Sequence, residues 1–149
     1  MATTTQTAHS KVVAILQSQI GTGLPTPLAT IYSYHNVANM LLDAITVEPV
    51  ANMPVVSDGG FGSSQFIDNH EITISVRVHT SYTGGVEDLV STMDLLDRVM
   101  TAMKTSMDLG DRYKFMRFAA EQVNVTFDGS QSVGGEVIII IHKVEGYAN

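Results

Sequence analysis

The chain has 149 residues, the size of one domain, and its 44% hydrophobic and 15% charged residues exclude a largely disordered chain. It contains no cysteine, which excludes disulfides and thiolate zinc sites, and its apolar runs are too short to predict a membrane-spanning helix. The net charge of −7 argues against tight DNA binding, and the low charged fraction suggests that other chains cover part of the surface.

The N-terminal segment predicts one helix. Residues 1–8 are polar and rich in threonine, so we expect a flexible arm there and no signal peptide. Apolar residues at helical spacing predict a helix over Ala8–Ile20, and Gly21 follows where a left-handed cap would lie.

The next segment allows two interpretations. Within Leu28–Ala44 we favour a short helix capped by Asn36, although Ile31 and Tyr32 could begin a strand. Residues Ile45–Val50 then predict a strand, which Pro49 restricts to a sheet edge or a strand end.

Residues 51–69 predict a long loop rich in glycine and serine. Loops of this length in compact domains either bind partners or are mobile, and both interpretations stand. If the loop makes assembly contacts, the candidate contact residues are Asp58, Phe61, Gln65 and Phe66.

The clearest strand and the clearest helix follow. Alternating apolar residues predict a half-buried strand over His70–Thr80. Apolar residues recur from Val86 to Met107 at a spacing of 3.6 and predict a long helix with one continuous apolar face. The methionines on this face favour core packing, with a partner surface as the alternative.

The C-terminal third predicts two more strands. Residues 113–127 alternate, and Asp128-Gly129 and Gly134-Gly135 predict a turn into a last strand over Glu136–Glu145. Because Val137–Ile141 is apolar at every position, this strand is either central or covered by another subunit. Ile138 and Ile140 are therefore candidate interface residues.

These elements predict an α+β fold over residues 1–149, in the order α-(α)-β-β-α-β-β. An antiparallel four-stranded sheet with helices packed on one face satisfies the burial pattern.

No segment predicts catalysis, and we expect no enzyme, no cofactor and no metal. The five histidines lack metal-ligand spacing, and the glycine tract 59–62 lacks the Lys-Ser/Thr of a phosphate-binding loop. Three basic residues, Arg112, Lys114 and Arg117, alternate with aromatic residues and could bind nucleic acid. In so acidic a chain we favour salt bridges to a neighbouring subunit.

The order of elements resembles that of the tail terminator (tail completion) proteins of long-tailed bacteriophages. The resemblance spans about residues 10–145 and rests on Ala44–Pro49, Glu71–Val78, Val86–Met107, Val125–Gly129 and Gly134–Ile140. It implies a virion subunit, made in the host cytoplasm, that forms a ring, typically a hexamer, at the head-proximal end of the tail tube. Its partners would be further copies of itself, the tail tube protein and the neck or connector proteins.

In this family DNA passes through the lumen without specific binding, and a long connection such as residues 51–69 can order on assembly. The alternatives are a head–tail connector or other neck component, and a small ligand-binding domain or enzyme that uses the glycine-rich loop. A host adaptor or chaperone that uses the methionine face is a third.

Overall fold

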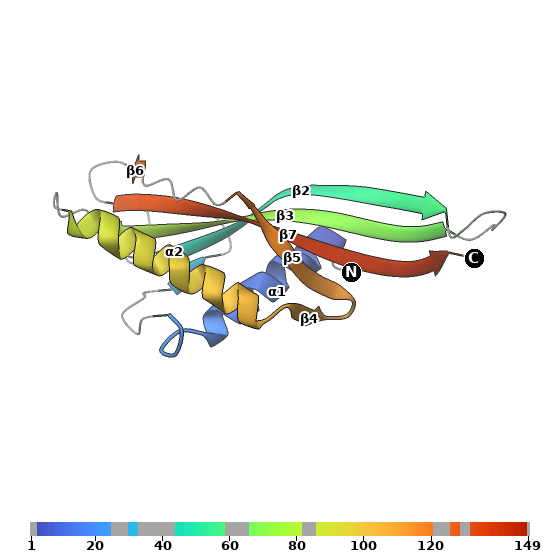
Figure 1. Ribbon diagram of the computed structural model, residues 1–149, viewed down its shortest axis with the longest axis horizontal. Helices are drawn as coiled ribbons and strands as arrows, with labels where there is room; N and C mark the ends of the chain where they lie inside the picture. Colours follow the sequence, from blue (N-terminus) through green and yellow to red (C-terminus); the bar gives the residue numbers. More distant parts are fainter. Residues whose placement is uncertain are drawn as a thin grey trace.

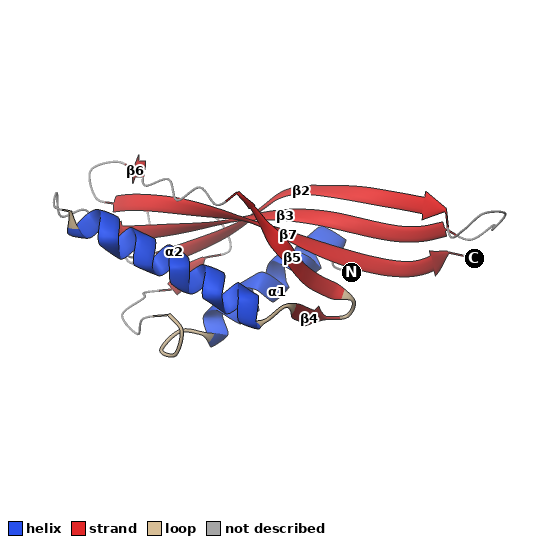
Figure 2. Cartoon of the chain, in the orientation of Figure 1, coloured by secondary structure: helices blue, strands red, loops and turns tan. Residues whose placement is uncertain are grey.

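The chain has an α+β fold in which the helices of its described part pack on a curled, mainly antiparallel sheet (Figures 1 and 2). The computed structural model describes residues 3–24, 30–32, 44–58, 66–81, 86–120, 126–128 and 132–148. The helices are α1 (Thr4–Ser18) and α2 (Glu87–Thr105). The strands are β1 (Thr30–Tyr32), β2 (Ala44–Asp58), β3 (Phe66–Ser81), β4 (Asp108–Gly110), β5 (Tyr113–Ala120), β6 (Thr126–Asp128) and β7 (Ser132–Ala148).

Helix α1 begins earlier than its apolar pattern predicts, and the expected flexible arm is wrong from Thr3 onward. The Thr3 side chain accepts a hydrogen bond from the Gln6 amide at 3.1 Å, and the Gln6 side chain accepts one from the Thr3 amide at 2.8 Å. This capping box satisfies amide groups that a helix start otherwise leaves without partners. A polar first turn can therefore be helical. The helix ends at Ser18, two residues before the predicted Ile20, and its cap residue is Gln19. Gly21 has the predicted positive φ, 87°, but lies beyond the cap.

The expected four strands and their chain order α-(α)-β-β-α-β-β are not matched exactly. The described strands run in the order β1-β2-β3-β7-β5-β4, and β6 also pairs with β7. Strand β1 lies parallel to β2, and the other pairs are antiparallel. Because β7 lies between β3 and β5, the prediction of a central last strand is confirmed.

The predicted loop over residues 51–69 is wrong at both of its ends, which belong to a long β-hairpin. Strands β2 and β3 stay paired from Ala44 opposite His79 to Asp58 opposite Phe66. Residues 51–53 are exposed and show no alternating burial. In this part of the hairpin the strands are joined by backbone pairing, with no buried face to mark them in the sequence. Pro49 lies where β2 has no second strand neighbour among the described residues, which confirms the edge prediction.

Two further predictions concern the irregular segments. Residues 33–43, where we expected a short helix, lie outside the described residues, while β1 and Ala44 are strand. The predicted turn at Gly134-Gly135 is wrong, because both glycines belong to β7 and lie opposite His79 and Val78.

The core lies between the helices and one face of the sheet. In β3 the alternate residues Ile72, Ile74, Val76 and Val78 are fully buried, and both helices contact this strand and each other. The same cluster contains Ala8, Val12 and Leu16 of α1, Leu95, Leu96, Val99, Ala102 and Met103 of α2, and Val137, Ile139 and Ile141 of β7.

Candidate functional site

Helix α2 exposes four apolar side chains at its N-terminal end, and these define the α2 stripe. Val86, which caps the helix, is 70% exposed, Leu89 43%, Val90 60% and Met93 43%. Their spacing of three and four residues places them on one side of the helix. The predicted continuous apolar core face is therefore wrong in this half, although Leu96 and Met103 further along are fully buried.

Polar residues occupy the inward positions where the α2 stripe faces outward. Asp88 and Thr92 are buried. The Thr92 hydroxyl donates to the Asp88 carbonyl oxygen at 2.8 Å and shares a 3.0 Å hydrogen bond with the Thr80 hydroxyl of β3. These contacts orient this end of α2 with its polar side against the sheet, which leaves the apolar side outside. The buried positions 88, 92, 95, 99 and 102 follow helical spacing and are the signal that sequence reasoning missed.

The α2 stripe has an acidic rim. The exposed residues Glu87, Asp94 and Asp97 lie around it, and the first basic residue of the helix is Arg98. Asp94 is paired with Arg98 at 2.9 Å. Within the described part of the chain, Glu87 and Asp97 have no ion pair, so their negative charge is available to a partner.

The predicted basic residues lie on and just before strand β5. Lys114 and Arg117 are exposed and lie opposite His142 and Ile140 of β7, on the sheet face turned away from the helices. Met116, at a β-bulge between Phe115 and Arg117, is 53% exposed. We call Lys114, Met116 and Arg117 the β5 surface.

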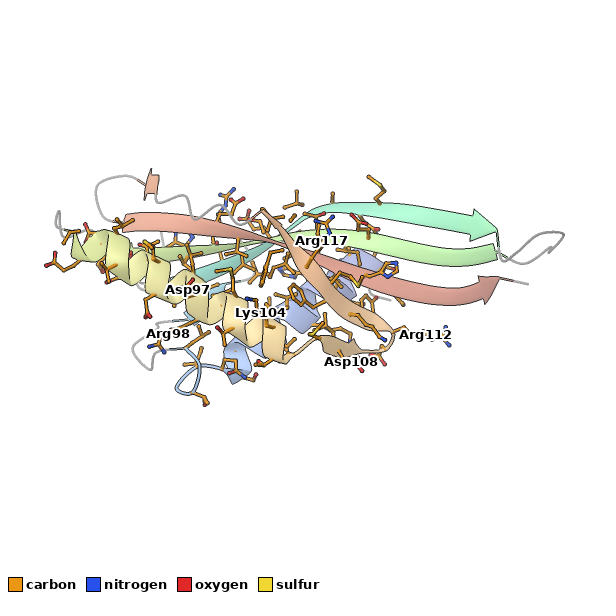
Figure 3. All side chains as sticks on the ribbon, viewed as in Figure 1. Asp97, Arg98, Lys104, Asp108, Arg112 and Arg117 are labelled. Atoms are coloured by element: carbon orange, nitrogen blue, oxygen red, sulfur yellow. The ribbon has the colours of Figure 1, made fainter. Side chains whose placement is uncertain are left out.

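Figure 3 labels Arg117 on β5, Arg112 near the turn before that strand, and Asp97 on α2. Arg112 lies in the turn between β4 and β5 and is exposed.

The other predicted interface residues do not join this surface as one site. The backbones of Asp58 and Phe66 are paired at the end of the β2–β3 hairpin, and residues 61 and 65 (Phe61 and Gln65) lie outside the described residues. Phe66 is paired with Ala148 of β7, and Lys114 is paired with His142 of the same strand. The six residues from His142 to Ala148 span about 20 Å along a strand.

The two isoleucines differ in accessibility. On β7, Ile138 is half-buried and Ile140 is only 5% exposed, so Ile140 offers little surface to a partner.

Among the described residues, a cleft of about 510 Å³ could hold a small ligand. It is lined by Lys11, Ala14, Ile15, Thr105, Ser106, Asp108 and Leu109. The Lys11 ammonium donates to the Leu109 carbonyl oxygen and to the Asp111 carboxylate, both at 3.0 Å. Lys11, the basic residue among those that line the cleft, is therefore already bound to two groups of the protein itself.

The described residues contain no group of three or more histidine, aspartate or glutamate side chains placed to hold a metal ion. His79 is buried, and its Nε2 forms a 3.1 Å hydrogen bond with the Thr46 hydroxyl. Neither α1 nor α2 is both long and apolar enough to cross a membrane.

The geometry thus offers two unlike surfaces, the α2 stripe with its acidic rim and the basic β5 surface. A comparison with models of protein families finds no match, and a comparison with curated proteins also finds none.

Proposed function

We propose that the chain is a structural subunit that assembles with copies of itself into a ring. The observation that carries this proposal is the α2 stripe, because contiguous apolar side chains on a protein surface mark contacts with other proteins. Val86 and Val90 each expose more than half of their surface, although α2 also supplies core residues such as Leu96.

The difference between the two exposed surfaces supports a head-to-tail assembly such as a ring. A contact between unlike surfaces leaves one of each uncovered on every pair, so further copies add until a ring closes or a filament grows. The α2 stripe is bordered by carboxylates, and the β5 surface carries Lys114 and Arg117. Six copies is the number that the resemblance to tail terminators implies.

In the virion this ring would cap the tail tube at its head-proximal end and join it to the neck or connector proteins. The net charge of −7 supports a lumen through which DNA slides without specific binding. A head–tail connector or other neck component is the closest alternative.

Electron microscopy of mixtures with the tail tube protein of the same phage tests this function. We expect rings at one end of the tubes and tubes that stop growing when the chain is added during polymerisation. Tubes of unchanged length with no ring at either end would contradict the terminator function, and rings bound only to portal complexes would favour the connector.

A further inference from the structure

The α2 stripe is out of reach of its own β5 surface. At the C-terminal end of α2, the Lys104 ammonium lies 5.9 Å from the centre of the Phe118 ring, so this end adjoins β5. Val90 precedes Lys104 by fourteen residues, which is about 21 Å along a helix. The β5 surface of the same copy therefore cannot cover the stripe, whereas that of a second copy can.

The β5 surface has the composition that this stripe requires. Lys114 and Arg117 carry positive charge at exposed positions, with no ion pair inside the described chain, and Met116 lies exposed between them. Methionine adapts to irregular apolar surfaces, which suits contact with a ridge of valine and leucine.

The charges on the two surfaces are opposite. On α2, Asp97 follows Met93 by four residues and Glu87 precedes Val90 by three, so both carboxylates border the apolar side chains. A basic surface with an apolar centre complements an apolar stripe with an acidic border, and such complementarity guides docking and its register.

Resting on the proposed self-assembly, we propose that the α2 stripe of one copy docks onto the β5 surface of the next copy. Val86, Leu89, Val90 and Met93 are covered at this contact, and Glu87 and Asp97 meet Lys114 and Arg117. The contact is head-to-tail, because each copy presents one stripe and one β5 surface.

Cysteine cross-linking tests the contact, since the natural chain has no cysteine to interfere. In the double variant Val90→Cys/Met116→Cys, the two cysteines of one copy are too far apart for a disulfide. Under mild oxidation we expect a ladder of covalent multimers on a non-reducing gel, rising to the full ring. The control Val90→Cys/Val50→Cys carries a similarly exposed second cysteine on β2 and should give no ladder beyond dimers.

A second variant, Leu89→Cys/Met116→Cys, is tested in the same way. If both variants assemble but neither gives a ladder, the proposed contact is wrong and the proposal of self-assembly is unaffected. A chain that stays monomeric under every condition would overturn both proposals.

Charge reversal is a second test of the proposed contact. Glu87→Lys/Asp97→Lys and Lys114→Glu/Arg117→Glu should each raise the concentration needed for half-assembly at least about tenfold. The fourfold variant has the wild-type net charge of −7, because two changes of +2 offset two of −2. We expect it to regain assembly, and a fourfold variant as weak as either half would overturn the contact.

Discussion

Three consecutive residues in the turn between β4 and β5 have positive φ angles. They are Gly110 at 79°, Asp111 at 52° and Arg112 at 69°. Gly110 pairs with Tyr113, so Asp111 and Arg112 are the central residues of a two-residue hairpin turn. Positive φ at both central positions is the geometry whose twist matches antiparallel strands. The unusual backbone at Arg112, a predicted interface residue, thus has a structural explanation.

Replacing Gly110 tests the importance of this turn. A Cβ atom would meet only the Lys11 ammonium, at 3.7 Å, so Gly110→Ala adds backbone strain without a clash. We expect a loss of about 1–2 kcal/mol in the free energy of unfolding, measured by urea denaturation. Gly110→Asn is the matched control and should lose less, because asparagine tolerates positive φ. Equal stability of wild type and Gly110→Ala would contradict the assigned geometry.

At the scale of elements, β3 and α2 differ in how well their sequences predict their structure. The alternation in β3 predicted its buried face, because Ile72, Ile74, Val76 and Val78 form one side of a half-buried strand. The predicted helix Val86–Met107 also agrees closely with α2, but the sequence does not predict which side of its N-terminal end faces the sheet. A buried hydrogen-bonded pair such as Thr80 and Thr92 has the same composition as a solvated face, so hydrophobicity alone gives the wrong side.

Two leucines seven residues apart on α2 separate folding from assembly. Leu96 is fully buried and Leu89 is 43% exposed. Leu96→Ala should lower the free energy of unfolding by about 2–5 kcal/mol, as cavities in cores do. Leu89→Ala should change the unfolding of the monomer by less than about 0.5 kcal/mol and yet weaken self-association. Denaturation at low concentration and sedimentation at high concentration measure the two effects, and assembly unchanged by Leu89→Ala would contradict the role of the stripe.

On the scale of the whole molecule, strands β2, β3 and β7 extend past both helices as a three-stranded ribbon (Figure 1). The sequence over residues 51–69 does not predict this ribbon, because these residues lack the alternating apolar pattern that burial imposes on residues 72–78 of β3. Pro49 and Pro54 remove two backbone donors from β2, and the His9 ring donates to the Val47 carbonyl oxygen at 2.8 Å. Such features limit uncontrolled pairing along a strand edge.

The candidate surfaces were predictable only in part. Because lysine and arginine are mostly exposed in folded proteins, the sequence alone predicts Lys114 and Arg117 as interface candidates. It does not predict the α2 stripe, because the exposure of the stripe depends on how the helix is rotated against the sheet. The sequence also predicts Asp58 and Phe66 as interface residues, but the fold places them at the far end of the ribbon.

The central claim, assembly into a ring, is tested most directly by the mass of the purified protein in solution. Light scattering measures this mass over a series of concentrations, with and without the tail tube protein. One chain has a mass of 16.1 kDa, and the account predicts a species of six times that mass, about 97 kDa, either alone or once the tube protein is present. A strict monomer or dimer in every condition would contradict the ring.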